Sequence, residues 1–263
     1  MGGEHGPENG RRAVRAAPVA WRAMSTRLQI GLLQCGYIAP DSAAGHGDYP
    51  EVFAELLGPE GVDLVTYDVQ QDPLPTDPGA HDGWLVSGSA SSAYEDLPWI
   101  PPVEGFLRRL IDDEAPLVAV CFGHQLLAQA LGGRVAKAEA GWGVGVHRYE
   151  LVGPPPAWMD PPPADGGFLM IASHQDQVME LPAAAEVIAR TDHCPVAAFT
   201  VGPRALAIQP HPEFSADVSR GLIGLRRGVI GEERSDSALA TLDEPLDHDR
   251  HQVATWMANF WRQ

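Results

Sequence analysis

Cysteine is scarce in this sequence, which has only Cys35, Cys121 and Cys194 among its 263 residues. So small and odd-numbered a set does not form the disulfide framework on which many small secreted domains depend. We therefore expect a reducing compartment, most simply the cytoplasm.

The sequence also has no run of eighteen or more apolar residues, so it predicts no membrane-spanning helix. Basic residues are few: 18 Lys and Arg stand against 35 Asp and Glu, which gives a formal net charge of −17. This excess of negative charge repels nucleic acid phosphates and anionic membrane surfaces at long range. The expected partner is therefore a small-molecule substrate, with no nucleic acid and no membrane.

The first 26 residues contain four arginines but no apolar core of seven or more residues, which a secretory signal requires. We expect residues 1–26 to be a disordered tail, with an organelle transit peptide as the alternative. Hydrophobic residues make up 44% and charged residues 20% of the sequence, which is ordinary for a globular protein. One domain over residues 27–263 is the simplest organisation for this length.

Short apolar runs alternate with helical segments in the first half of the chain. Strands are expected at 28–34, 62–67, 84–86 and 117–120, and helices at 51–57, 103–113 and 123–131. Beyond residue 141 the runs are strand-like with little helix between them, at 144–152, 167–172, 185–189, 197–201 and 205–209. Loops are expected at 154–165 and 231–245, the second being acidic, and a closing helix at 248–261. These patterns predict an α/β fold with an open, mostly parallel sheet, helices on both faces and added antiparallel strands.

Cys121 stands between an apolar strand and the start of a helix, within the string AVCFGHQ at residues 119–125. A sharp turn there directs its side chain into the cleft at the carboxyl end of the sheet, where open α/β sheets place their sites. The helix N-terminus favours a thiolate, and backbone amides such as that of Phe122 can hold an oxyanion. Cys121 is thus a candidate nucleophile.

Two other interpretations of Cys121 are open. A free cysteine is often a buried and inert residue. Cys121 and His124 also form a Cys-x-x-His pair, but no second pair at ligand spacing accompanies it, so we expect no metal.

A base for the cysteine is predicted about ninety residues downstream, at Pro-His-Pro-Glu in residues 210–213. The two prolines hold the backbone extended around His211. Residues two apart on an extended chain project to the same side, so the Glu213 carboxylate can reach the His211 ring. A nucleophile, a base and a group that orients the base together support acyl transfer.

These residues resemble the class I glutamine amidotransferases, whose hallmarks are a Gly-x-Cys-x-Gly elbow, often extended as Cys-Phe-Gly-His-Gln, and a late His-Pro-Glu. Both strings occur here in the expected order. Ser-Gly-Ser at 87–89 is similar to the oxyanion loop of the family, and Ser-His-Gln-Asp at 173–176 to a segment that helps to hold substrate. The departure is Ala119, where the family usually has glycine. The resemblance implies a flavodoxin-like sheet.

The resemblance also implies roles for individual residues. Cys121 would be the nucleophile, His211 the general base and acid, and Glu213 its orienter. Backbone amides of Gly88 and Phe122 would hold the oxyanion. Contacts to the glutamyl substrate would come from Gln125, Ser173 and His174, although His174 is equally interpretable as a structural histidine.

The expected activity is hydrolysis of the glutamine side-chain amide through a cysteinyl thioester, without metal or cofactor, to supply ammonia to a separate synthase. A γ-glutamyl peptidase or hydrolase with the same three residues is the first alternative. A non-catalytic, DJ-1-like binding or stress protein is an alternative of another class. Segment 139–144 and the insertion after Gly153 should help to decide between these activities. Trp142 could line the substrate pocket or a partner surface, but an aromatic in a glycine-rich turn is more often packing.

Overall fold

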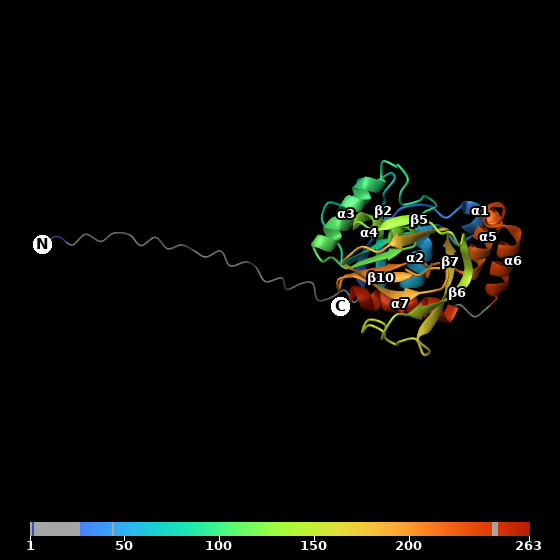
Figure 1. The fold of residues 1–263 in the computed structure, drawn as a ribbon. Coiled ribbons are helices and arrows are strands. Elements are labelled where there is room, and N and C mark those ends of the chain that lie inside the picture. Colours follow the sequence, from blue (N-terminus) through green and yellow to red (C-terminus); the bar gives the residue numbers. More distant parts are fainter. Residues whose placement is uncertain (1, 3–26, 44, 244–246) are drawn as a thin grey trace.

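The structure, a computed structural model, describes residues 2, 27–43, 45–243 and 247–263. In this part of the chain nine strands form one sheet, at β1 (Leu28–Gln34), β2 (Val62–Asp68), β3 (Gly83–Val86), β4 (Leu117–Val120), β6 (Gly143–Leu151), β7 (Gly167–His174), β9 (Ala185–Arg190), β10 (Ala198–Val201) and β11 (Ala205–Ile208). Their order is β2-β1-β3-β4-β11-β10-β9-β6-β7 (Figure 1). The expected tail over residues 1–26 lies outside the described residues, apart from residue 2.

The first five strands in this order are parallel to one another, which is the flavodoxin-like arrangement. β3, β4 and β11 are buried at every residue, which explains why their sequences are short uninterrupted apolar runs. Because parallel strands end at the same edge, the segments that follow β3, β4 and β11 meet there. The fold thereby gathers residues 87–89, 121 and 211 at one place.

The remaining strands extend the same sheet as antiparallel neighbours, as expected from the hairpin-rich second half of the sequence. Two further strands were not expected: β5 (Arg134–Lys137) and β8 (Asp176–Glu180) form a separate antiparallel pair. They are short and mostly polar, so their sequences carry no clear period-2 signal. Because β8 directly follows β7 and β5 directly follows helix α4 (Phe122–Ala130), this pairing holds the end of β7 near the end of α4.

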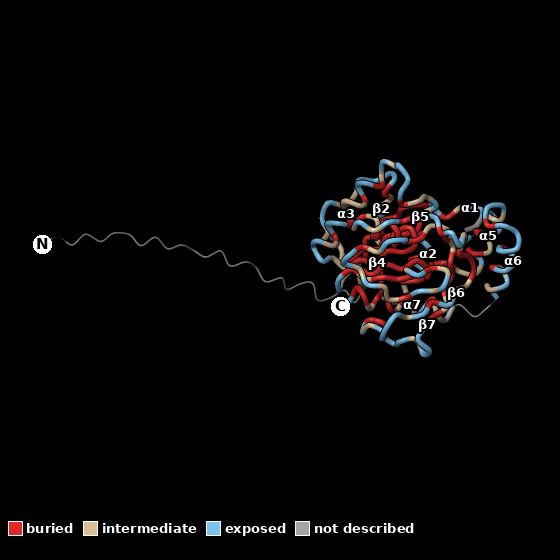
Figure 2. Tube along the Cα trace, in the orientation of Figure 1, coloured by how far each residue is buried: buried red, intermediate tan, exposed pale blue. Residues whose placement is uncertain are grey.

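Helices cover both faces of the sheet. Side chains of α2 (Tyr49–Leu57) and α7 (Asp247–Trp261) belong to one buried cluster, and those of α3 (Ile100–Asp112) and α4 to the other. Figure 2 shows the strands as a buried interior beneath an exposed outer layer. Helix α2 begins before the expected start because Asp48 and Glu51 form a capping box at its N-terminus. A one-turn helix, α1, spans Pro40–Ala43.

The acidic segment 231–245 was expected to be a loop, and this was wrong for most of its length. Residues Glu232–Thr241 form helix α6, which follows the equally unexpected α5 (Ala216–Ile230). Arg227 of α5 pairs with two carboxylates of α6, and the Thr241 hydroxyl accepts a hydrogen bond from the Val146 amide of β6. Tertiary partners therefore stabilise a helix whose sequence has little apolar periodicity.

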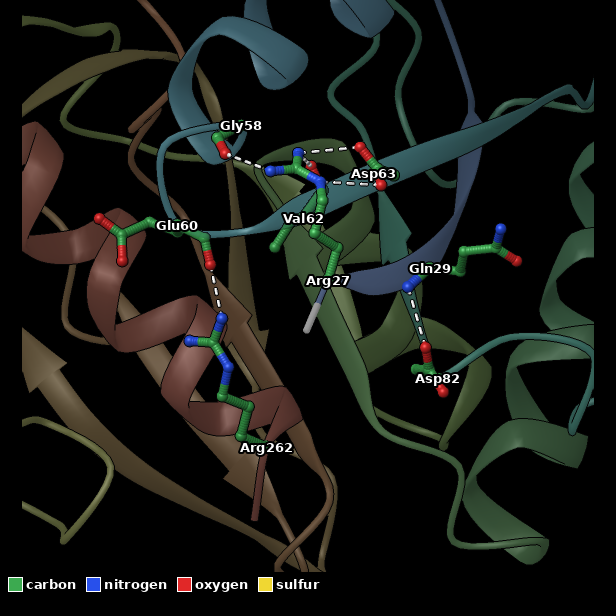
Figure 3. A network of polar contacts seen from close by, with 8 residues as sticks. All are labelled: Arg27, Gln29, Gly58, Glu60, Val62, Asp63, Asp82 and Arg262. Carbon is green, nitrogen blue, oxygen red and sulfur yellow. Dashed lines mark hydrogen bonds and ion pairs between the residues drawn. The ribbon is translucent and has the colours of Figure 1, made fainter. Parts of the chain in front are cut away.

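The amino ends of the strands carry polar anchors (Figure 3). The Arg27 guanidinium donates two hydrogen bonds to the Asp63 carboxylate, and the Gln29 amide donates to Asp82. At the end of the chain the Arg262 side chain donates to the Glu60 carbonyl. None of the described helices is long and apolar enough to cross a membrane.

Candidate active site

Cys121 lies at a strained turn between β4 and α4. Its φ of 53° and ψ of −103° fall in a region that residues other than glycine rarely adopt. A side chain at Gly123 would lie 2.8 Å from the Val86 carbonyl oxygen, so glycine is needed at that position. Ala119 is fully buried within β4, and the elbow forms despite the methyl group that most of the family lacks there. The sharp turn predicted from the sequence is present.

The Pro-His-Pro-Glu segment follows β11, the direct parallel neighbour of β4. The His211 amide donates to the Ile171 carbonyl of β7 at 2.9 Å, and the ring of Phe214 stacks on the imidazole with centroids 4.0 Å apart. His211 Nδ1 and Glu213 Oε1 are 2.7 Å apart, and both side chains are at most 2% exposed. This geometry fixes the ring and directs its other nitrogen away from the carboxylate.

Cys121 and His211 line the same small cavity. Burial by itself lowers the pKa of His211, but the interactions of its ring with Cys121 and Glu213 outweigh burial and raise it. The protonated imidazolium form of His211 is therefore favoured at neutral pH. The three residues that the sequence analysis selected thus lie close together: His211 is hydrogen-bonded to Glu213 and shares a cavity with Cys121.

The loop after β3 lies against this elbow. The Gly123 amide donates to the Ser87 carbonyl at 3.2 Å, and the Ser87 hydroxyl accepts from the Cys35 amide. Among the described residues neither the Gly88 nor the Phe122 amide has a hydrogen-bond acceptor. Both amides therefore remain free to bind a negatively charged oxygen.

Replacing Gly88 with alanine is expected to lower kcat by about 10- to 100-fold, because loss of an oxyanion donor has effects of this order or larger. A Cβ at this position would lie 2.4 Å from the Tyr49 hydroxyl and 3.2 Å from the His211 ring, so the loop must shift. The double variant Gly88→Ala, Tyr49→Phe removes the nearest atom and should regain part of the activity. The kcat values of Gly88→Ala, of the double variant and of the control Tyr49→Phe are measured by steady-state kinetics. Equal activity of Gly88→Ala and the unmodified protein would contradict a role of Gly88 in the oxyanion hole.

A cavity of about 280 Å³ opens beside Cys121 and is lined by Gln125, Ser173 and His174 among others. The side-chain nitrogen of Gln125, Nε2, donates hydrogen bonds to the Asp176 carbonyl and to the Gln209 side-chain oxygen. The side-chain oxygen of Gln125 has no hydrogen-bond donor among the described residues. Burial lowers the pKa of His174 to about 3, so its ring is neutral, and its Nδ1 is 3.2 Å from the Asp176 carbonyl oxygen. The residues predicted to contact substrate therefore all lie at the cavity, together with Cys121.

Several residues of this region were missed by sequence reasoning. Tyr49 is buried beside Cys121 and Gly88; burial and the nearby charges of Cys121 and Glu213 raise its pKa, so it stays a neutral phenol. Arg226 of α5 lines the cavity, and Arg250 of α7 donates to the Pro212 and Glu213 carbonyls behind the histidine. None of the three stands in a motif, so the sequence gives no local signal for them.

The fold and the position of the site place the chain among α/β proteins that carry a cysteine elbow at the carboxyl edge of a mostly parallel sheet. A family model described as "Glutamine amidotransferase class-I" matches residues 52–223. The chain belongs to the class I glutamine amidotransferase family, as the two motifs predicted.

Comparison with individual proteins agrees with this. Gamma-glutamyl peptidase 4 of Arabidopsis thaliana is 31% identical over 207 residues, which cover 76% of this chain and 82% of the peptidase. The glutamine-hydrolysing GMP synthase of Chromobacterium violaceum is 32% identical over 64% of this chain, but over only 32% of the synthase. A crystal structure of a glutamine amidotransferase from Thermotoga maritima has the same fold, with a TM-score of 0.74 at 16% identity, over 90% of this chain and 99% of the other. Family and relatives imply a hydrolase.

Proposed function

We propose that the protein hydrolyses the γ-amide bond of γ-glutamyl peptides or conjugates through a thioester on Cys121. The observation that carries this proposal is that Cys121 lines a small cavity together with His211, whose ring is hydrogen-bonded to Glu213, while Cys121 also lines the larger cavity. Two backbone amides without acceptors adjoin the thiol, as acyl transfer requires.

In the first step the Cys121 thiolate attacks the γ-carbonyl carbon, and the new C–S bond moves an electron pair onto the carbonyl oxygen. The Gly88 and Phe122 amides hold this oxyanion. When the carbonyl re-forms, the C–N bond breaks and His211 gives its proton to the leaving nitrogen. Water then attacks the thioester carbonyl while His211 takes a proton from that water. When the carbonyl re-forms, the C–S bond breaks, its electron pair returns to Cys121 as the thiolate, and the released product has a free γ-carboxylate.

The choice of a γ-glutamyl peptide over free glutamine rests on the relatives. Gamma-glutamyl peptidases 4 and 5 of Arabidopsis thaliana match this chain over 82% and 88% of their own length. The match to GMP synthase is confined to about a third of that protein. Glutaminase activity that feeds a separate synthase, the activity expected first from the sequence, is therefore the second candidate, supported by this weaker match.

The two candidates are separated by incubating the protein with γ-glutamyl dipeptides and with glutamine. Ammonia and free amino acids are followed over time. We expect kcat/KM for a dipeptide to exceed that for glutamine by about tenfold or more, since contacts to the leaving residue add to transition-state binding. Faster release of ammonia from glutamine would instead favour the glutaminase. Absence of turnover on every γ-glutamyl compound would support the non-catalytic alternative.

A further inference from the structure

Arg226 is a cation of the cavity that has no carboxylate partner among the described residues, although six other described arginines form ion pairs with Asp or Glu. It projects from α5 and is partly buried. One guanidinium nitrogen donates to the Ser173 hydroxyl at 3.2 Å, and the guanidinium carbon lies 5.8 Å from the centre of the Trp142 ring. In so acidic a chain, an unpaired guanidinium held over an aromatic ring inside a cavity points to an anionic ligand.

In the proposed reaction, Arg226 lies on the side of Cys121 from which the leaving group departs. A second, narrower cavity of about 20 Å³ is lined by His211, Tyr49 and Phe214. Arg226, Ser173 and Cys121 line both this cavity and the larger one. Since His211 protonates the leaving nitrogen in the proposed reaction, the groups attached to that nitrogen lie close to Arg226.

The other charged groups of the cavity come from different segments. Lys137 of β5 and Asp176 of β8 stand opposite each other in the register of this strand pair. The Tyr94 hydroxyl donates a hydrogen bond to the Asp176 carboxylate at 3.1 Å. Glu95, the neighbour of Tyr94 in the chain, also lines this part. These groups carry both signs, which suits the α-amino and α-carboxylate groups that every γ-glutamyl compound has. Arg226 is then left for a further carboxylate, which glutamine lacks.

We propose that Arg226 binds the carboxylate of the residue that follows the γ-glutamyl bond, and so selects peptides with a free carboxylate there over glutamine and over amidated peptides. This inference rests on the proposed function, because it assigns the leaving side from the role of His211. Trp142 supports the guanidinium from its ring face, which answers the question of its role that the sequence left open.

The test compares γ-glutamylalanine with γ-glutamylalaninamide, which differ only in the carboxylate. Arg226→Gln is expected to lower kcat/KM for γ-glutamylalanine by about 10- to 100-fold, which is the range of one charge-assisted hydrogen-bonded pair. The kcat/KM values for γ-glutamylalaninamide and for glutamine should change by less than about threefold. Arg226→Lys keeps the charge but loses the planar guanidinium group, so its kcat/KM for γ-glutamylalanine should lie between those of the unmodified enzyme and Arg226→Gln. Arg227→Gln is the matched control, since Arg227 pairs with carboxylates of α6 and lines neither cavity.

An equal loss of activity of Arg226→Gln on the acid, the amide and glutamine would overturn the inference, because it would mean that Arg226 acts only through Ser173 and Trp142. A binding experiment separates this from a failure of the proposed function. Calorimetric titration of Cys121→Ala, with and without Arg226→Gln, measures affinity for the same two dipeptides without turnover. If the unmodified enzyme cleaves neither dipeptide, the proposed function is wrong. The binding data still test the carboxylate site in that case: tighter binding of the acid than of the amide, lost in Arg226→Gln, would support it. Equal affinities for the acid and the amide would reject it.

Discussion

Replacing Cys121 with alanine is expected to reduce γ-glutamyl hydrolysis by at least about 10⁴-fold, because removal of a nucleophile in a coupled catalytic unit leaves only binding and oxyanion stabilisation. The nearby Tyr49 is a neutral phenol, and burial raises the pKa of both Cys35 and Cys194, so none of these three groups can take the place of the Cys121 nucleophile. Steady-state assays with γ-glutamylalanine measure this loss.

The variant should remain folded, since the substitution only shortens one side chain at the end of β4 and leaves the backbone turn and the surrounding core unchanged. Its thermal midpoint is expected to move by no more than about 4 °C, which corresponds to roughly 1 kcal/mol for a chain of this size. Cys194→Ala is the matched control. Burial raises the pKa of Cys194 to about 12, so it is not a thiolate at neutral pH and its loss should leave kcat unchanged. Full activity of Cys121→Ala, or loss of activity in Cys194→Ala alone, would reject the assignment of Cys121 as the nucleophile.

Replacing Glu213 with glutamine is expected to lower kcat by about 10²- to 10⁴-fold, as loss of the orienting carboxylate does in related catalytic units. The amide keeps the shape of the side chain but removes a negative charge 2.7 Å from the imidazole. The neighbouring negative charges raise the pKa of His211, so the protonated ring that donates to the leaving nitrogen is lost only as pH rises through that raised value. With one of these charges removed, the pKa of His211 falls.

The alkaline limb of the kcat/KM profile should therefore move to lower pH in Glu213→Gln. Profiles of the variant and the unmodified protein from about pH 5 to about pH 11, a range that includes both the ordinary histidine value and the raised value of about 10, test this. Glu180→Gln is the control, because Glu180 is an exposed carboxylate that pairs with Arg134 at the surface. An alkaline limb at the same pH in both enzymes would show that Glu213 does not set the protonation of His211.

Much of the site could be predicted because its parts are local. Cys121 follows a buried apolar strand and precedes a helix, and Glu213 follows His211 by two residues on an extended, proline-flanked segment. Each of these arrangements is a property of a few consecutive residues. The same is true of most strands: β1, β4 and β11 were located within one residue of their observed ends.

The features that the sequence missed depend on partners far away in the chain. Helix α6 is stabilised by Arg227 and by contacts to β6, not by its own apolar period. Strand β8 exists because it pairs with β5, about forty residues upstream. Such elements have weak local preferences, and tertiary contacts decide their conformation.

The sequence alone determined the family, the sheet with its parallel and antiparallel parts, and the cysteine, histidine and glutamate proposed for catalysis, because short-range patterns encode all three. Only the tertiary structure decided which other groups face the substrate. Arg226 and Tyr49 come from helices separated by more than 150 positions, and their approach to Cys121 results from packing on the same side of the sheet. The substrate selectivity that we propose is a property of that packing, which no run of consecutive residues specifies.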